Sequence, residues 1–391
     1  MMSNKNILIL GASELQLPGI KKAQEMGLNC IAVDYDSHAA GAEEADIFYN
    51  ISTMDLEGVL QVAKKHNVKG IFTICSDRPM RIVAKVGNAL GLNTISEKSA
   101  LLATNKAYMR NSFAKNNVPI PQYRICFSEE ECMKAVCDIG FPAIIKPSDN
   151  AGSRGISYID NKSNIAEAYV YAKENSMEGV VLVEEFLHGT EVSVEAFVEN
   201  GNISIIQVTD KITTGAPHFV EMGHDQPSAH NAKTIQEISD ITKCAIKSLE
   251  IEGGPIHAEL KITENGVKVI ELGARLGGDH ISTDLVMLST GIDMVEANIK
   301  WAIGEPFDIK QKYRRYSAIR YVGKLNFVKM DKQCLNIIDY FSWNRLYVDE
   351  IKSSRDRECC FIVSDVNKES LKNKISKIDN ALGRNDKLFY W

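Results

Sequence analysis

Short apolar runs alternate with amphipathic helical segments near the N-terminus, and this alternation constrains the fold more than any other feature. Apolar runs at residues 6–10, 30–33 and 70–74 are separated by segments with helical periodicity, among them 56–66 and 80–90. Strands that alternate with helices form βαβ units, whose strands pair in parallel. The sequence therefore predicts an α/β domain with a parallel sheet at the start of the chain.

A glycine turn and a later acid in this region invite a dinucleotide-binding hypothesis. Gly11 follows the first predicted strand, and Asp34 lies about twenty residues further on, as in the Rossmann fingerprint. That fingerprint needs glycines where Ser13 and Gln16 stand, so close approach of a pyrophosphate is not provided for. We favour the simpler interpretation, in which Gly11 makes the turn and Asp34 caps a strand, over an NAD-dependent oxidoreductase.

Composition and charge exclude several classes of protein. The 391 residues are 45% hydrophobic and 25% charged, with a net charge of −6, which argues against nucleic acid or an anionic membrane as the main partner. No apolar run approaches the ~20 residues of a membrane span. The nine cysteines are scattered and the eight histidines lack zinc-binding spacing. We therefore expect a cytoplasmic protein with reduced thiols and without a catalytic zinc.

Residues 253–273 predict a β-hairpin with a polar face. Within it, apolar residues alternate with His257, Glu259 and Lys261, so these three side chains share one face of a half-buried strand. The second strand of the hairpin carries another acid, Glu271. Whether the two acids meet depends on the length of the loop.

The loop length decides which residues of the hairpin face each other. A two-residue Asn-Gly turn would pair Glu264 with Val267 and put Glu259 and Glu271 on opposite faces. A three-residue loop would pair Thr263 with Val267 and set the two acids opposite each other. Facing carboxylates repel at Cβ separations of ~4.5–5.5 Å, and Mg²⁺ would remove that conflict because it takes hard oxygen ligands. Two unrelated surface acids are the alternative.

Two further segments carry candidate nucleotide-binding groups. Lys146 ends a predicted strand and precedes a loop rich in Gly, Ser and Asn, which can hold phosphate oxygens by charge and backbone N–H groups. Glu191, Ser193 and Glu195 share one face of a later strand and can accept hydrogen bonds from ribose or adenine. A surface turn and an exposed sheet face are the respective alternatives.

Taken in order, these pieces resemble the ATP-grasp superfamily. The ordered set comprises Asn105-Lys106 before a helix, Lys146 with its loop, Glu184-Glu185-x-x-x-Gly-x-Glu191, and Glu259 followed by Glu271-x-x-x-Arg275. The resemblance extends from the N-terminal α/β unit to about residue 279. One position departs from it, because the family often has Asn where Gly273 stands. The number of bound metal ions is therefore left open.

The resemblance implies an α/β and α+β multidomain architecture. It places a Rossmann-like, parallel-sheet pre-ATP-grasp domain at residues 1–95 and an ATP-grasp domain at 96–305, with a mobile lid at about 119–186. A small C-terminal α+β domain would occupy residues 306–391. That last segment carries no motif that indicates a role.

The resemblance also implies ATP as a substrate, Mg²⁺ as the metal and roles for individual residues. The facing carboxylates Glu259 and Glu271 would hold Mg²⁺, with Mn²⁺ as an alternative. The catalytic group would comprise Arg275, Lys146 and His257. The remaining contacts to ATP would come from Lys106, Gly152, Ser153, Gly155, Glu184, Glu185, Phe186, Leu187 and Glu191.

The family reaction implies two steps, in which a carboxylate attacks ATP to give an acyl phosphate and an amine then displaces phosphate. The motifs around residues 221–225 and 275–279 are similar to those of L-amino-acid ligases. In that branch an acid pairs with an ammonium group, an arginine pairs with a carboxylate, and a histidine orients the substrate or moves a proton. The implied substrate-binding residues are Glu221, His224, Arg275, Gly277 and Gly278.

Other functions remain as alternatives. Ser13-Glu14-Leu15 is similar to the purine-biosynthesis and carboxylase-type branch, which acts through carboxyphosphate or formyl phosphate. Gly273 supports a third hypothesis, a nucleotide-binding module without catalysis. Asp77 and Arg78 follow a predicted strand where open α/β sheets bind ligands, or they form an internal salt bridge. The expected partners are a small-molecule carboxylate and an amine, and the family implies a homodimer.

Overall fold

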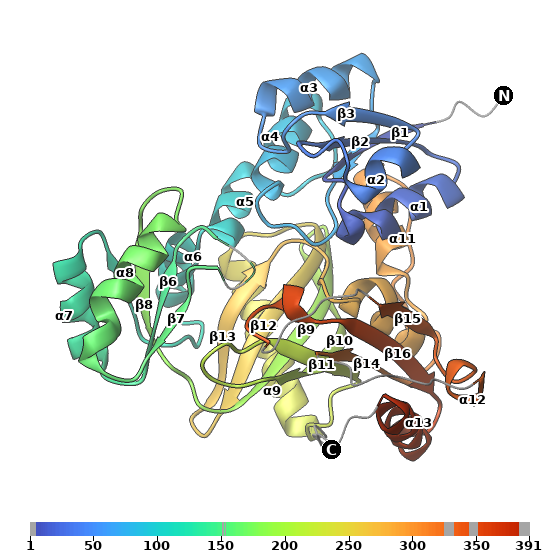
Figure 1. The fold of residues 1–391 in the computed structure, drawn as a ribbon. Helices are drawn as coiled ribbons and strands as arrows, with labels where there is room; N and C mark the ends of the chain where they lie inside the picture. The colour runs from blue at the N-terminus through green and yellow to red at the C-terminus, as the bar shows by residue number, and fades with distance from the viewer. Residues whose placement is uncertain (1–4, 151, 153, 324–331, 344–350, 383–391) are drawn as a thin grey trace.

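The chain forms three sheets, each with its own helices. The structure is a computed structural model that describes residues 5–150, 152, 154–323, 332–343 and 351–382. Figure 1 shows the N-terminal unit in blue and a smaller unit in green, on different sides of one large sheet. None of the helices in the described part is long and apolar enough to cross a membrane.

The N-terminal unit is a parallel sheet of four strands in the order β3-β2-β1-β4, which confirms the predicted α/β fold. Its strands are β1 (Asn6–Leu10), β2 (Asn29–Asp34), β3 (Ile47–Asn50) and β4 (Gly70–Phe72). The short strand β3 is half-buried, and its weak pattern was not recognised in the sequence. Its helices are α1 (Leu17–Glu25), α2 (Ala40–Glu44), α3 (Leu56–Lys65) and α4 (Met80–Leu90).

Strand β1 buries both of its faces. Ile7 and Ile9 belong to one apolar cluster with residues of α1 and α11 (Met294–Ala302), and Leu8 and Leu10 to another with residues of α3 and α4. A strand covered on both faces reads as a continuous apolar run. Because α11 lies more than 200 residues after this unit in the sequence, the N-terminal unit is packed directly onto the rest of the molecule.

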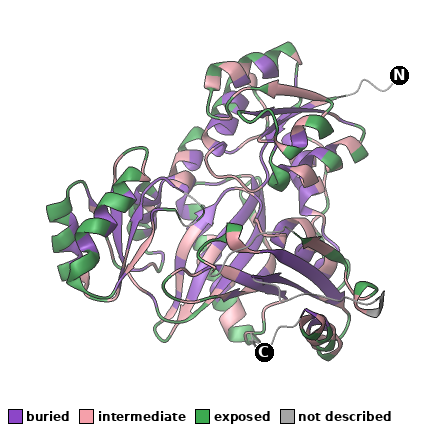
Figure 2. Cartoon of the chain, in the orientation of Figure 1, coloured by how far each residue is buried: buried purple, intermediate pink, exposed green. Residues whose placement is uncertain are grey.

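The green unit is an antiparallel sheet in the order β5-β8-β6-β7, within the range predicted as a lid. Its strands are β5 (Tyr123–Cys126), β6 (Ala143–Pro147), β7 (Ser157–Ile159) and β8 (Val181–Glu185). Helices α7 (Glu129–Ile139) and α8 (Ile165–Glu174) contribute to its apolar core. Figure 2 shows the outer surfaces of these helices exposed and the central strands β6 and β8 largely buried. Helices α5 (Glu97–Thr104) and α6 (Lys106–Lys115) lead into it.

The large sheet has eight strands in the order β13-β12-β9-β10-β11-β14-β16-β15. Its strands are β9 (Thr190–Glu199), β10 (Asn202–Thr213), β11 (Glu221–Gln226), β12 (Gly254–Thr263), β13 (Gly266–Gly273), β14 (Tyr316–Val322), β15 (Tyr340–Trp343) and β16 (Cys359–Asp365). The remaining α-helices are α9 (Ala232–Ser248), α10 (Val286–Thr290), α12 (Lys332–Leu335) and α13 (Lys368–Ala381). Strand β14 pairs with β11, so the sheet is continuous across the predicted domain boundary at residue 305.

Candidate active site

Two carboxylates face each other on neighbouring strands of the large sheet. Glu259 of β12 lies directly opposite Glu271 of β13, as the sequence analysis expected. Each is neutralised by a lysine: Lys106 Nζ lies 2.7 Å from a Glu271 oxygen, and Lys211 Nζ lies 2.9 Å from a Glu259 oxygen. The site therefore combines two hard anionic ligands with two cations.

The hairpin reaches this register by a route that the sequence analysis did not predict. Its turn has two residues and pairs Thr263 with Gly266, so it is neither the Asn-Gly turn nor the three-residue loop considered from the sequence. A β-bulge at Ile270 of β13 then adds one residue and restores the facing acids. The carbonyl oxygen of Ile270 accepts a hydrogen bond of 2.6 Å from Arg110. This buried arginine supports the bulge.

Lys211 was not predicted, although it lies at the centre of the polar face. Its side chain is 4% exposed, and its Nζ contacts Glu221 as well as Glu259, with Glu191 at 3.9 Å. Burial lowers the pKa of Lys211, but these three acids outweigh burial and raise it well above the usual value. The sequence offers one weak signal. Lys211 lies two residues after Thr209, so the two side chains share a face of the strand, and Thr209 pairs with β9 in the structure.

Lys146 and Lys106 have different surroundings. Glu184 is buried between Lys146 Nζ at 2.7 Å and Arg110 Nε at 2.8 Å. Burial raises the pKa of Glu184, but Arg110 and Lys146 outweigh it and lower the pKa to about 2. Burial lowers the pKa of Lys146, whereas Glu271 raises that of Lys106 against its burial. The carboxylate of Glu184, predicted as an ATP contact, is thus a counter-ion.

The loop after β6 is anchored at its base. The buried carboxylate of Asp149 accepts hydrogen bonds of 2.8 Å from Ser176 Oγ and from the backbone N–H of Glu178. Lys106 Nζ donates to the carbonyl oxygen of Asn150 at 2.8 Å. These contacts fix the loop beside the two lysines predicted to contact phosphate.

Two glycines of this loop have positive φ angles, which favour glycine. They are +68° at Gly152 and +79° at Gly155. A Cβ at Gly155 would also lie 2.7 Å from the Cβ of Asn175. Among the residues that the structure describes, no atom outside the neighbouring residues lies within 4 Å of a Cβ built at Gly152. Ser153, another predicted ATP contact, lies outside the described residues.

An aromatic cluster joins the lid sheet to the large sheet. The ring of Phe186 lies 5.0 Å from that of Tyr158 on β7 and 5.6 Å from that of Phe219, between β10 and β11. Lys261 Nζ lies 5.0 Å from the centre of the Phe186 ring, within range of a cation–π contact. The cluster supplies flat apolar surface beside the strand that carries Glu191.

The other residues predicted to contact adenine and ribose lie around this cluster. Glu191 pairs with Lys261 at 3.1 Å, and Glu185 pairs with Lys268 at 3.2 Å. Leu187 is buried. The structure thus brings the predicted adenine and ribose residues together along one edge of the site.

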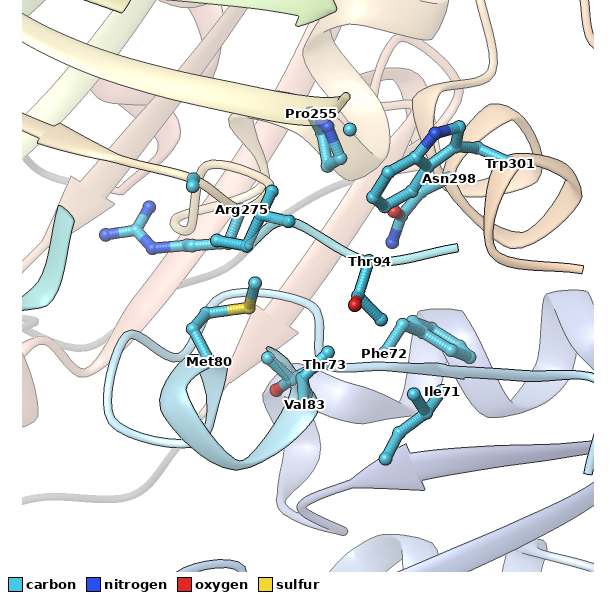
Figure 3. A pocket seen from close by; sticks show the side chains of 13 residues that line it. Ile71, Phe72, Thr73, Met80, Val83, Thr94, Pro255, Arg275, Asn298 and Trp301 are labelled. Atoms are coloured by element: carbon cyan, nitrogen blue, oxygen red, sulfur yellow. The ribbon is translucent and has the colours of Figure 1, made fainter. Parts of the chain in front are cut away.

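Arg275 is held by an acid of the N-terminal unit. Its Nε and Nη2 donate to the two carboxylate oxygens of Asp77 at 2.9 and 3.0 Å. Figure 3 shows its side chain lining a largely apolar pocket and its guanidinium pointing away from Trp301. Burial lowers the pKa of Arg275, but Asp77 outweighs it and raises the pKa. The structure therefore shows Asp77 in an internal salt bridge, which was one of the two interpretations of this residue from the sequence.

His257 is charged at neutral pH. Its Nδ1 lies 2.6 Å from Glu195 and its Nε2 lies 3.5 Å from Glu259. Burial lowers the pKa of His257, but Glu195 outweighs it and raises the pKa to about 9. His257 is thus a cation rather than a free base.

The two glycines predicted to bind substrate differ in the space around them. A Cβ built at Gly277 would lie 2.7 Å from the His257 ring, whereas a Cβ at Gly278 would have more space.

Glu221 and His224, predicted to bind substrate, meet Asp279 at the other end of Lys211. The imidazole Nε2 of His224 lies 3.8 Å from Glu221 and 3.7 Å from Asp279. Arg357, which the sequence analysis did not identify, donates to both oxygens of Asp279 at 2.7 and 2.9 Å. This second cluster adjoins the facing acids, since Lys211 touches both groups.

Protein side chains occupy the space beside the turn after β1, where a dinucleotide would bind in a Rossmann fold. Gln16 Oε1 accepts a hydrogen bond of 2.8 Å from the backbone N–H of Ile74, and the Asp34 carboxylate accepts one of 2.8 Å from Ala12. A Cβ at Gly11 would lie 3.1 Å from the Gln16 side chain. These contacts agree with the simpler interpretation of Gly11 and Asp34 over a dinucleotide site.

Part of the chain that contains this site is similar to proteins of known families. Residues 139–284 match the model of the ATP-grasp domain. The chain is 27% identical over 274 residues to the uncharacterized protein y4rH of Sinorhizobium fredii, covering 69% of this chain and 57% of that protein. It is 28% identical over 169 residues to the formate-dependent phosphoribosylglycinamide formyltransferase of Sulfurisphaera tokodaii, covering 42% and 41%. The chain thus spans about half the length of these curated relatives.

Solved structures share the fold over nearly the whole chain. The phosphoribosylglycinamide synthetase of Anaerococcus prevotii superposes with a TM-score of 0.76 at 24% identity, and the L-amino acid ligase of Bacillus licheniformis with 0.81 at 18%. Each comparison covers 97% of this chain and 98% of the other. At these identities the likeness concerns the fold.

Proposed function

We propose that this chain is an ATP-dependent ligase of the ATP-grasp type, which activates a small carboxylic acid as an acyl phosphate and joins it to an amine. The observation that carries this proposal is the pair of facing carboxylates, Glu259 and Glu271, beside the buried Lys106, Lys146 and Lys211. Phosphoryl transfer needs positioning and neutralisation of charge more than covalent help from the protein. This site offers both.

The facing acids fit Mg²⁺. They present oxygen donors, which Mg²⁺ prefers, and each already holds a cation at 2.7 to 2.9 Å. Mg²⁺ held by Glu259 and Glu271 would supply positive charge to the phosphates of ATP. Mg²⁺ would replace Lys106 at Glu271, and Lys106 would then be available to bind phosphate oxygens. Lys146, next to its counter-ion Glu184, would also be available.

The proposed reaction has two steps. A carboxylate oxygen of the acid attacks the γ-phosphorus of ATP, the bond to the β-phosphate oxygen breaks, and ADP leaves. The amine then attacks the acyl carbon, phosphate leaves, and the amine loses a proton. The loop that carries Gly152 and Gly155 closes over the phosphates and excludes water from the acyl phosphate. The β5–β8 sheet acts as the lid that carries this loop.

For the acid we favour a one-carbon compound, formate or bicarbonate, over an amino acid. The relative from Sulfurisphaera tokodaii is named for formate. In addition, Arg275 already gives two hydrogen bonds to Asp77, so it is not available as a clamp for an α-carboxylate. An amino-acid ligase remains the second candidate, because the L-amino acid ligase fold superposes on 97% of the chain.

The test is ADP release from Mg-ATP with hydroxylamine present to trap acyl phosphates. Formate, bicarbonate and single amino acids are added in turn, each with and without a panel of amines. We expect ADP release that depends on formate or bicarbonate and increases with one amine. Release that depends on an amino acid would select the second candidate, and no acid-dependent release from any acid would contradict the ligase.

A further inference from the structure

We propose that Glu221, His224 and Asp279 bind a first-row transition-metal dication such as Zn²⁺, separately from the Glu259–Glu271 pair. Their donor atoms all lie within 4.8 Å of one another. The three residues come from β11 and from the segment after β13. This proposal goes beyond the ligase reaction and does not depend on ATP turnover.

His224 is the observation that distinguishes this cluster from an ordinary acidic patch. Its side chain is 0% exposed, and neither ring nitrogen has a hydrogen-bond partner among the described residues. A buried polar atom left without a partner costs free energy. The Nε2 atom points between Glu221 and Asp279, and a neutral imidazole nitrogen is the most common protein ligand for metals.

The spacing of the donor atoms fits a small ion. Nε2 lies 3.8 Å from Glu221 Oε2 and 3.7 Å from Asp279 Oδ2, and the third separation is at most 4.8 Å. An ion in the plane of the three atoms and equidistant from them would have bonds of at most about 2.4 Å, close to the lengths at which histidine and carboxylate bind zinc.

A β-bulge in β11 brings Glu221 and His224 to one face. His224 pairs with Lys211 and Glu221 with Thr213, two residues along β10. These partners share a face, although residues three apart on a regular strand point to opposite faces. The extra residue at this bulge is Met222. The bulge therefore aims both side chains at Asp279.

The two carboxylates have the outer partners that metal ligands usually have. Lys211 contacts Glu221 through Oε1, which leaves Oε2 toward His224. Arg357 holds both oxygens of Asp279, and its guanidinium lies 3.7 Å from the centre of the Tyr321 ring. Each carboxylate oxygen has two acceptor sites, so it can accept these hydrogen bonds and still bind a metal. Such outer partners orient ligands and tune affinity.

The ligand set predicts the class of metal. One imidazole with two carboxylates suits zinc, manganese or cobalt, whereas Mg²⁺ prefers oxygen ligands alone. The facing acids Glu259 and Glu271 offer oxygen only. The two clusters should therefore select different ions, even though both touch Lys211.

The test is Co²⁺ titration of the full-length, chelator-treated protein without nucleotide, followed by visible absorption. We expect one Co²⁺ with the intense band of a low-coordinate site that contains nitrogen. Substitution His224→Gln should weaken Co²⁺ binding at least about 100-fold, because loss of an outer partner alone typically costs 10- to 100-fold. Zn²⁺ should displace the Co²⁺ and abolish the band.

Further variants keep the proposal falsifiable if His224→Gln does not fold. Glu221→Gln and Asp279→Asn change side chains that are 29% and 21% exposed, and both should also lose the band. His280→Gln, next to Asp279, and Glu271→Gln at the facing acids are controls that should keep it. A band that survives in all three site variants overturns the proposal. So does an absence of Co²⁺ binding, which would leave an imidazolium or a substrate ammonium between the acids.

Discussion

The two acidic clusters on the large sheet are built in the same way but offer different donor atoms. Each depends on a bulge, at Ile270 in β13 or at Met222 in β11, and Lys211 lies between them. The first cluster offers oxygen alone and adjoins the lysines predicted to bind phosphate. The second adds the nitrogen of His224. The comparison shows that a β-bulge orients the acids in each cluster. The kinds of donor atom, oxygen alone or oxygen with nitrogen, decide which ion each cluster can bind.

Glu271→Gln should have the largest effect and should separate the two clusters. The amide cannot neutralise Mg²⁺ or hold Lys106 as a carboxylate does, so we expect kcat for ADP release to fall about 10³-fold. Co²⁺ binding at the second cluster should not change. Steady-state kinetics and Co²⁺ titration measure the two effects on one preparation.

A control on the same hairpin is Glu264→Gln, because this residue is exposed in the turn. It should keep activity within about twofold of the parent, as expected for a surface change. If Glu271→Gln and Glu264→Gln have equal activity, the first cluster is not the site of phosphoryl transfer.

Lys211→Met should weaken both clusters together. It leaves Glu221 and Glu259 without their buried cation, and breaking a buried ion pair costs roughly 3 to 5 kcal/mol of unfolding free energy. Urea unfolding measures this loss, and Mg²⁺ or Zn²⁺ should restore part of it. Lys268→Met is the matched control, since the side chain of Lys268 is 21% exposed whereas that of Lys211 is 4% exposed, and more exposed pairs contribute about 1 kcal/mol or less. Equal losses in the two variants would contradict the central role of Lys211.

Glu184→Gln tests a carboxylate that is outside both clusters. Its pKa is lowered to about 2 by Arg110 and Lys146 against burial, so its stabilising contribution is present above about pH 4.5 and is lost as the pH falls toward 2. The shift corresponds to about 3 kcal/mol. The difference in unfolding free energy between parent and variant should be constant near neutral pH and shrink below pH 4.5. A difference that does not change with pH would show that Glu184 is not held ionised by its partners.

Gly223→Ala should have the smallest effect and should act on the second cluster. The added Cβ would lie 2.8 Å from the carbonyl oxygen of Ile319 and 3.0 Å from Arg320 Cδ, which strains β11 beside its bulge. We expect a loss of about 1 to 3 kcal/mol in unfolding free energy and weaker Co²⁺ binding. Gly278→Ala is the control for stability, since its Cβ would meet only Cys75 at 3.8 Å. A Gly223→Ala variant with unchanged Co²⁺ affinity would show that the geometry of the bulge does not matter.

The regular elements could be predicted from the sequence because their patterns are local. The parallel sheet follows from apolar runs such as Asn6–Leu10, which the structure reproduces residue for residue. The alternation in β12 correctly placed His257 and Glu259 on one face, and that in β9 correctly placed Glu191 and Glu195 on one face. That these two faces adjoin is known only from the structure. These inferences need only period-two patterning and turn chemistry.

The irregular parts of the site could not be predicted, because they depend on contacts between distant segments. The bulge at Ile270 leaves no mark in the sequence, so the sequence could not show how the hairpin sets the two acids opposite each other. The pairing of Arg275 with Asp77 joins two units, and Arg357 reaches Asp279 from a segment without a recognisable motif. The position of each of these side chains is set by a partner that is distant in the sequence, so the neighbouring residues in the sequence do not reveal its role.

The most direct test of the account is transfer of ¹⁸O from the acid to phosphate. The protein is supplied with Mg-ATP, an amine and formate or bicarbonate labelled with ¹⁸O, and the phosphate released is analysed by mass spectrometry. Attack of the carboxylate on the γ-phosphorus predicts one ¹⁸O atom in each phosphate. Because Glu271→Gln should turn over slowly, this variant should form little labelled phosphate. Phosphate released without ¹⁸O from every labelled acid, amino acids included, would show that water attacks ATP and would contradict the proposed ligase.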